Sequence, residues 1–422
     1  MPLREITLSN GLRTLIMDGL PTAVLRVEMI WDAGRPYEPK PLVGALTDEL
    51  LLEGTRHRPT AALDAYFEQF GTHPDQADLM DTANLGLSTI VRHAGNTLPV
   101  LAEIIAEPAL AEDRFRRIIR RRRQRLRENL ADNDTLAYRL ISEFTYGAEH
   151  PYGYNSTGEL YAALTVEDVR AYHASHYHAG NGTLLVIGQV DATVERLLDD
   201  TFGQLPTGPR APRPTLPDAP TDPGIFQLRK PRAGQTMIRR SRPGVDIHHP
   251  DYPALAVLET VYGGYFGSRL MRNIREDKGL TYGIDSDLET YRFAGALTVA
   301  ADVANENLEL VRGEIATEAR KLRQDLIPAP ELDMVRAYLT GSIAMQLDGR
   351  FGHAYRWRAG LIKDYEPRDY LLRLNEAILD VSAARLRELA EEYLDPAREW
   401  ELILGGADVI DEATEIQPPA NP

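Results

Sequence analysis

Arg275 and Tyr282 are the side chains whose types and spacing most clearly point to chemistry in this 422-residue chain. They lie in the run Asn-Ile-Arg-Glu-Asp-Lys-Gly-Leu-Thr-Tyr-Gly, which begins at Asn273. A guanidinium and a phenol both donate hydrogen bonds, and the guanidinium is always charged. A lone arginine and tyrosine at this spacing would more often be a surface ion pair and the edge of a core. The sequence around the pair therefore decides whether it is functional.

A glycine-rich segment precedes the pair, and it reads Tyr-Gly-Gly-Tyr-Phe-Gly-Ser-Arg over residues 262–269. Ser268 is a good N-cap, so we expect a helix to begin near it. A glycine-rich helix start can hold phosphate, but no Walker lysine pattern follows, and the net charge of −16 opposes anions. We interpret the segment as a peptide-contacting loop, with tight packing between domains as the alternative. Its candidate contact residues are Gly263, Gly264, Tyr265, Gly267 and Ser268.

A proline-rich segment divides the chain. Residues 205–224 carry seven prolines between Pro206 and Pro223, which excludes a helix and indicates an extended linker. We expect one domain over residues 1–204, a second over residues 225–408, and a loose tail over residues 409–422.

The two halves resemble each other in the order of their expected elements. A strand, an apolar helix and a second strand are expected at 23–34, 42–54 and 82–91 in the first half, and at 235–244, 254–264 and 294–303 in the second. The repeat is too long for a solenoid unit and indicates a duplicated domain. Strands, then helices, then a returning strand predict an α+β fold with largely antiparallel sheets.

The run from Gly263 to Tyr282 resembles the arginine/tyrosine signature of the M16 (insulinase/pitrilysin-like) zinc peptidases. The segments 54–55, 150–153 and 181–191 also stand in family-like places, and the resemblance covers roughly residues 3–408. It implies two homologous α/β domains that form half of a clamshell. It also implies that Arg275 and Tyr282 face the zinc across a chamber, bind the substrate near the scissile bond and stabilise the charge that develops on its oxygen.

The zinc motif of that family has lost its ligands in this chain. The family carries His-x-x-Glu-His, in which two histidines on one helix face bind zinc and the glutamate deprotonates the bound water. Counting back from the Gly-Thr pair after this helix places Ala45 and Glu49 at the histidine positions and Asp48 at the base position. The third ligand falls near Arg125 or Leu126, where an arginine would repel a cation. We therefore expect no metal here, and we expect Asp48 and Glu49 to be solvated helix acids.

Short-chain members of this family can divide the work between a zinc-bearing protein and one that carries the arginine and tyrosine. The chain resembles the second kind, a non-zinc subunit of a heterodimeric metallopeptidase that is inactive alone. The resemblance implies a zinc-bearing M16 paralogue as partner, zinc in that partner, and unfolded peptides as substrates. One alternative is a catalytically inactive peptide-binding or structural protein on the same scaffold. Another is an independent peptidase with other metal ligands.

Composition limits the remaining classes. The absence of cysteine excludes disulfides, thiolate metal sites and cysteine nucleophiles. The acidic net charge argues against nucleic-acid partners and anionic membranes, and no stretch approaches the roughly 20 apolar residues of a membrane span. The amino terminus has no apolar core of signal-peptide length, so we expect a cytoplasmic protein, with a processed periplasmic form as the alternative.

A histidine cluster and an arginine-rich segment give weaker indications of function. His173, His176 and His178 have the look of a metal cluster, but no acidic partner is in fixed register, so we expect helix-surface histidines. The segment Arg114–Glu128 contains nine arginines and keeps an apolar stripe, which predicts an amphipathic helix with a basic face. Given the resemblance, that face is hypothesised to attract acidic peptides or to clamp the partner subunit.

Overall fold

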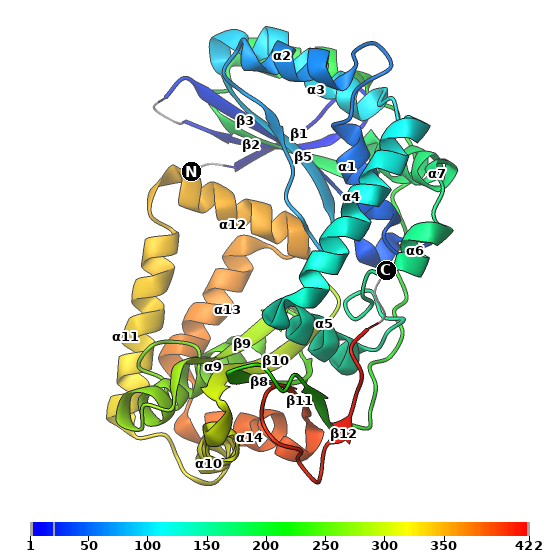
Figure 1. Ribbon diagram of the computed structural model, residues 1–422. Helices are drawn as coiled ribbons and strands as arrows, with labels where there is room; N and C mark the ends of the chain where they lie inside the picture. Colours follow the sequence, from blue (N-terminus) through cyan, green and yellow to red (C-terminus); the bar gives the residue numbers. More distant parts are fainter. Residues whose placement is uncertain (1–2, 20–21, 420–422) are drawn as a thin grey trace.

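The computed structural model describes residues 3–19 and 22–419 and contains two six-stranded sheets, one built mainly by each half of the chain (Figure 1). The first sheet has the strand order β1 (Leu3–Thr7), β2 (Arg13–Asp18), β6 (Gly182–Gly188), β3 (Val24–Trp31), β5 (Ala83–Ile90) and β4 (Pro74–Asp75). The second has the order β12 (Thr414–Glu415), β7 (Ile225–Arg229), β11 (Trp400–Gly405), β8 (Gln235–Gly244), β10 (Gly295–Ala304) and β9 (Thr281–Thr290).

The two sheets share one topology over five strands. The order β2-β6-β3-β5-β4 matches β7-β11-β8-β10-β9, and in both sheets the first of these pairs is parallel and the others are antiparallel. The sheets differ at one edge, where β1 runs antiparallel to β2 and β12 runs parallel to β7. The α+β fold with largely antiparallel sheets is thereby confirmed.

Helices pack against both sheets. In the first half they are α1 (Val43–Leu51), α2 (Thr60–Glu68), α3 (Ala94–Ala106), α4 (Glu112–Ala131), α5 (Asn133–Tyr146), α6 (Gly158–Ala163), α7 (Val166–His176) and α8 (Ala192–Thr201). In the second half they are α9 (Tyr252–Tyr262), the π-helix η5 (Met271–Asp277), α10 (Leu308–Gln324), α11 (Ala329–Gln346), α12 (Gly349–Lys363), α13 (Pro367–Asp380) and α14 (Ala383–Tyr393). Short 3-10 turns lie at 35–37, 91–93, 179–181, 202–204, 305–307 and 396–398.

Each half also lends one helix to the sheet of the other half. Helix α5 of the first half packs its buried residues Leu136 and Ala137 against Trp400 and Leu402 of the second sheet. Helix α12 of the second half lies next to the first sheet (Figure 1). Its Ala354 packs against apolar side chains of β2 and β6. Both sheets are therefore covered on two faces, which explains why successive residues are buried along most of β2 and all of β11.

The segment between the halves contains no helix or strand over residues 205–224. It is held against the first half where the Arg210 Nε donates to Asp32 at 2.9 Å and the Ala211 N–H donates to the Asn181 side chain at 2.8 Å. Asp32 also forms a buried ion pair with Arg292 of the β9–β10 connection at 2.6 Å. The first half, the linker and the second half thus converge on one carboxylate.

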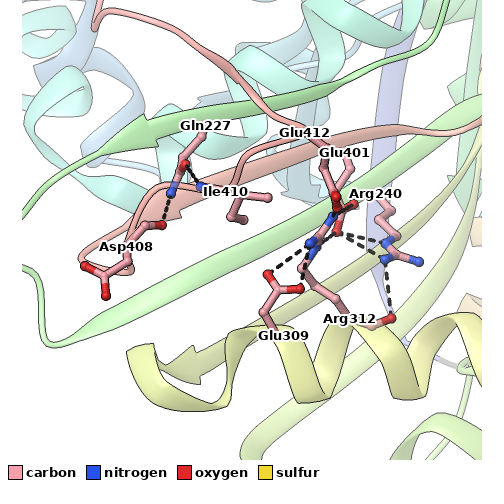
Figure 2. Close-up of polar contacts among 8 residues, drawn as sticks. All are labelled: Gln227, Arg240, Glu309, Arg312, Glu401, Asp408, Ile410 and Glu412. Carbon is pink, nitrogen blue, oxygen red and sulfur yellow. Dashed lines mark hydrogen bonds and ion pairs between the residues drawn. The ribbon is translucent and has the colours of Figure 1, made fainter.

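The expectation of a loose tail beyond residue 408 is wrong for its first part. The Gln227 side chain donates to the Asp408 carbonyl at 2.8 Å and accepts from the Ile410 N–H at 3.0 Å, as Figure 2 shows. The segment then adds β12 to the edge of the second sheet, where the Ile416 N–H donates to the Gln227 carbonyl. The tail orders because the edge strand β7 offers unpaired backbone groups. Residues 420–422 lie outside the described part of the chain.

A buried ion-pair network joins the second sheet to α10. The Glu401 carboxylate accepts from Arg240 at 3.1 Å and from Arg312 at 2.9 Å, and all three residues are buried (Figure 2). Burial alone would raise the pKa of Glu401, but the two guanidiniums outweigh it and hold that pKa below its usual value. The carboxylate stays charged and connects β8, β11 and α10.

Candidate functional site

Helix α1 carries positions 45, 48 and 49, which the M16 resemblance assigns to the zinc motif. The helix buries Val43, Leu46 and Leu50 on one face, which is the spacing of an amphipathic helix. Its first turn is fixed by Glu38, whose carboxylate accepts from the N–H groups of Leu42 and Gly44 at 3.0 and 2.8 Å. The opposite face presents positions 45, 48 and 49 to α4 and α7.

Asp48 and Glu49 are not solvated helix acids, which corrects the sequence-based expectation. The Tyr177 hydroxyl donates to Asp48 at 2.7 Å, and burial raises the pKa of Asp48 to about 7. Glu49 is paired with two arginines of α4, Arg121 and Arg122, and the Arg122 Nε donates to it at 2.6 Å. Burial opposes the charge of Glu49, but these arginines prevail and lower its pKa. Both acids are therefore engaged inside the chain.

The guanidinium of Arg122 lies beside Ala45 and Glu49, the two positions that the resemblance assigns to zinc-binding histidines. Besides its ion pair with Glu49, it donates to the Ala45 carbonyl at 3.4 Å. The residues that face the motif from α4 are thus Arg121 and Arg122 rather than Arg125 or Leu126, and Leu126 is buried in the first core. Within residues 3–19 and 22–419, no group of three or more histidine, aspartate or glutamate side chains could hold a metal ion. The positive charge at this site is supplied by the protein itself.

The raised pKa of Asp48 makes a prediction about stability. The folded chain keeps this proton up to about pH 7, whereas an unfolded aspartate releases it near its ordinary value of 3.8. The contribution of Asp48 to stability is full below the unfolded pKa and is lost as the pH rises through the folded one. Asp48→Asn keeps an acceptor for Tyr177, so it should gain thermal stability relative to the wild type as pH rises from about 4 to about 8.

Glu49→Gln is the matched control for this experiment, because the pKa of Glu49 is shifted down. Its wild-type contribution is present above the unfolded pKa and is lost as pH falls, so Glu49→Gln should lose stability relative to the wild type as the pH rises. The measurement is the melting temperature of the three proteins across that pH range. Parallel profiles for wild type and Asp48→Asn would show that the carboxyl of Asp48 titrates normally.

The glycine segment follows α9 and packs against β9. A Cβ atom on Gly263 would lie 2.5 Å from the backbone nitrogen of Ser286, and one on Gly264 would lie 2.4 Å from a Glu259 carboxylate oxygen. Close packing against the backbone therefore requires glycine at position 263, whereas at position 264 a Cβ would displace the Glu259 side chain. The Ser268 hydroxyl accepts from the Met271 N–H at 3.4 Å, so the helical turns begin after Ser268 as the sequence predicts. Gly267 lies between these two points, against the Tyr265 ring.

Arg275 and Tyr282 are joined by a tight turn. Arg275 lies in η5, and the chain turns at Gly279, whose φ of +63° favours glycine and whose N–H donates to the Arg275 carbonyl at 3.1 Å. The Arg275 guanidinium lies over the Phe266 ring, 4.8 Å from its centroid. Tyr282 is the second residue of β9 and is 90% exposed. The arginine is therefore held against the glycine segment, and the phenol projects into solvent.

A groove of about 590 Å³ begins at Tyr282 and runs along β9. Its floor is the face of β8, β10 and β9 that is turned toward α5, and α5 forms its wall. Arg275 and the segment 263–268 do not belong to its lining. In Figure 1, α1 lies in the upper part of the molecule with α4 and α7, whereas α9 and β9 lie in the lower part. The chain therefore does not bring α1 together with Arg275 and Tyr282.

Several groove residues were missed from the sequence, namely Tyr146 of α5 and the acids Asp285, Asp287 and Glu289 of β9. The acids occupy alternate positions of a strand, so they share one face of the sheet. The alternation of acidic residues between Tyr282 and Thr290 could therefore have been recognised in the sequence. Tyr146 gave no such signal, because its place in the groove depends on the packing of α5 on the other half.

The histidine cluster is packed within the chain. His173 hydrogen-bonds the Ile105 carbonyl through Nε2 at 2.9 Å, and His178 is buried with its Nε2 at 3.1 Å from the Ser175 carbonyl. The description as helix-surface histidines is therefore wrong for His178. Its burial follows from the linker, because His178 contacts Gly208 closely enough that a Cβ there would come within 2.7 Å of its ring.

Part of the basic face of α4 forms ion pairs with acids of α1 and of the turn that follows it. Arg114 and Arg121 pair with Glu53, and Arg121 and Arg122 pair with Glu49. Phe115, Ile118 and Leu126 of the same helix are buried, as the amphipathic pattern predicts. Three arginines of this face therefore neutralise Glu49 of α1 and Glu53 of the turn that follows α1.

Comparison with known proteins places this geometry in a family. A family model described as the peptidase M16 inactive domain matches residues 163–339. An uncharacterised zinc protease of Bacillus subtilis, YmxG, is 22% identical over 351 residues, which cover 82% of this chain and 85% of that protein. The crystal structure of a peptidase M16 inactive domain from Pseudomonas fluorescens superposes with a TM-score of 0.86, at 22% identity, covering 97% of this chain and 99% of that one. The chain thus matches the M16 peptidase family over residues 163–339 and shares the fold of an M16 structure over nearly its whole length.

The relatives include one named as an inactive metalloprotease and others named as proteases. A probable inactive metalloprotease of Bacillus subtilis, YmfF, is 24% identical over 338 residues, covering 73% of this chain and 77% of that protein. A protease from Helicobacter pylori shares the fold with a TM-score of 0.83 at 20% identity, covering 96% and 99% of the two chains. Across residues 3–19 and 22–419, each helix is too short or too polar to cross a membrane.

Proposed function

We propose that this chain is the non-zinc subunit of a heterodimeric M16 metallopeptidase. It contributes Arg275 and Tyr282 as substrate contacts, and one half of the peptide chamber, to a partner that carries the zinc. The observation that supports this most strongly is the exposure of Tyr282, which is 90% accessible at the start of β9. A large aromatic side chain that is left almost wholly exposed at the mouth of a groove is suited to a contact with another molecule.

The state of the zinc helix supports the same proposal. The positions of the two histidines hold Ala45 and Glu49, and the guanidinium of Arg122 lies beside them. Hydrolysis by this family needs a metal-bound water and a general base, so both would come from another chain. Bacillus subtilis has one relative named as a zinc protease and one named as a probable inactive metalloprotease, so both kinds occur in one organism.

In the proposed complex, Arg275 supplies a fixed positive charge and Tyr282 a neutral donor. Both would bind the peptide around the scissile bond, where negative charge develops on the carbonyl oxygen. Stacking on Phe266 limits the freedom of the guanidinium before substrate arrives. The chain's own role is therefore to bind and orient the peptide and to stabilise charge, while the metal chemistry takes place on the partner.

Reconstitution tests this proposal. The chain is mixed with the paralogue from its own host that keeps an intact His-x-x-Glu-His, and hydrolysis of a quenched fluorescent, unstructured peptide is followed. Hydrolysis is expected only from the mixture and should cease when zinc is chelated. A paralogue that cleaves equally well alone would contradict the proposal. Peptide binding by this chain without partner-dependent cleavage would instead favour an inactive peptide-binding protein on the M16 scaffold.

A further inference from the structure

The groove along β9 is acidic. Five carboxylates line it, from Asp134, Asp285, Asp287, Glu289 and Asp302, against the guanidiniums of Arg239 and Arg240. Arg239 is already paired with Asp134 and Asp302, at 2.7 and 2.8 Å, and Arg240 is bound to Glu401. Both guanidiniums of the groove therefore have their ion-pair partners elsewhere than in the acids of β9.

No ion pair engages Asp285, Asp287 or Glu289 in the part of the chain that the structure describes. Partial burial in the groove raises the pKa of Asp285, Asp287 and Glu289, and neighbouring carboxylates add to the rise at Asp285 and Glu289. The charges of Arg239 near Asp285 and of Lys363 near Asp287 oppose these shifts without reversing them. Lys363 is a nearby cation, and its amino group is hydrogen-bonded to Thr290 at 3.0 Å. The groove thus holds negative charge that an incoming cation would stabilise.

The three acids are spaced for an extended partner. They occupy alternate positions of β9, so neighbouring carboxylates are separated by about 7 Å along the strand. β9 is also the edge strand of its sheet, and it pairs with β10 alone among the described strands. A peptide in strand conformation carries its alternate side chains at the same interval.

A second group in the groove needs a hydrogen-bond partner. Tyr146 lines the groove wall and is 3% exposed, and its hydroxyl has no partner among the described residues. Its ring is fixed edge-on against Tyr291 and Tyr152. A buried phenol without a partner is uncommon in folded proteins, and a peptide carbonyl is an acceptor that would satisfy it.

We propose that this groove binds the basic segment of an extended peptide, with lysine or arginine side chains against Asp285, Asp287 and Glu289 and a peptide carbonyl on the Tyr146 hydroxyl. This inference rests on the proposed function only for the premise that the chain engages peptides. It adds a substrate class, namely peptides with basic residues. Tyr282 and Gly283 line the same groove, so the basic residues of a bound peptide would lie to one side of the Arg275–Tyr282 pair.

Fluorescence anisotropy on the full chain tests the groove. The probe is a fluorescein-labelled, unstructured peptide of about a dozen residues with lysine at alternate positions, and its counterpart has glutamine at those positions. With three charge pairs in a partly exposed groove, the lysine peptide should bind about tenfold more tightly. Asp285→Asn combined with Asp287→Asn should reduce that preference to about twofold, with the affinity for the glutamine peptide unchanged.

A matched double variant, Glu306→Gln with Asp325→Asn, removes the same net charge at exposed sites outside the groove and should keep the full preference. Tyr146→Phe should weaken both peptides by about fivefold without changing their ratio. Melting temperatures confirm that each variant is folded.

Three results would overturn the groove proposal: equal binding of the two peptides by the wild type, a full lysine preference in the Asp285/Asp287 variant, or no binding of either peptide. The readout needs no zinc partner, so it is independent of reconstitution. Lysine preference without partner-dependent hydrolysis would refute the split-peptidase proposal and leave the groove in place.

Discussion

Replacing Glu401 by alanine is expected to lower the free energy of unfolding by about 3–5 kcal/mol. The carboxylate accepts hydrogen bonds from Arg240 and Arg312, and all three residues are buried between β8, β11 and α10. Removing the carboxylate would leave two guanidiniums buried beside each other with their main counter-charge gone. Such a change costs more than the pair itself contributes, because the orphaned charges keep their desolvation penalty.

Glu309→Ala and Glu412→Ala are the controls, because both acids also pair with Arg312 but have 69% and 61% of their side chains exposed. Each should cost no more than about 1 kcal/mol, as is usual for exposed pairs. Denaturant unfolding of the three variants measures the differences. Equal losses for Glu401→Ala and the two controls would show that the buried network does not hold the second half together.

Arg275→Ala is expected to lower kcat of the reconstituted peptidase by about 10²–10³-fold while assembly is unchanged. The reason is that a fixed donor to a developing oxyanion acts mainly in the transition state, so its loss affects turnover more than binding. Arg275→Lys should recover only part of the rate, because an ammonium retains the charge but lacks the planar fork that stacks on Phe266. Tyr282→Phe removes a single donor and should reduce kcat in the same direction.

Arg320→Ala on α10 is the control for this series, since it removes an exposed arginine away from the site. Steady-state kinetics with one quenched peptide, together with size-exclusion chromatography of each complex, separates turnover from assembly. An Arg275→Ala complex that forms normally and cleaves at the wild-type rate would show that Arg275 is not a catalytic residue.

Local periodicity predicted the elements of this fold well. The strand expected at 235–244 is β8 with the same bounds, and the helix expected at 42–54 is α1 at Val43–Leu51. Both follow from apolar spacing that is complete within the segment. The exchange of α5 and α12 between the halves could not be predicted, because it depends on contacts between residues such as Leu136 and Leu402 that are far apart in sequence.

In the candidate site, too, local features could be predicted from the sequence and tertiary contacts could not. The signature from Gly263 to Tyr282 is continuous in sequence, and its N-cap and turn are where local rules place them. The state of Asp48 and Glu49 depends instead on Tyr177 and on the arginines of α4, which arrive only through folding. A charged residue on a helix is solvated by default, and only the tertiary structure reveals that these two acids have partners inside the chain.

Native mass spectrometry of this chain, tagged and purified from its own host, asks directly whether it works with a zinc-bearing partner. The split-peptidase proposal predicts a complex with a second chain of similar size that carries one zinc ion, and loss of that zinc together with the second chain when the complex is dissociated. A metal-free monomer or homodimer would contradict it and would leave an M16 scaffold that binds peptides or serves as a structural protein.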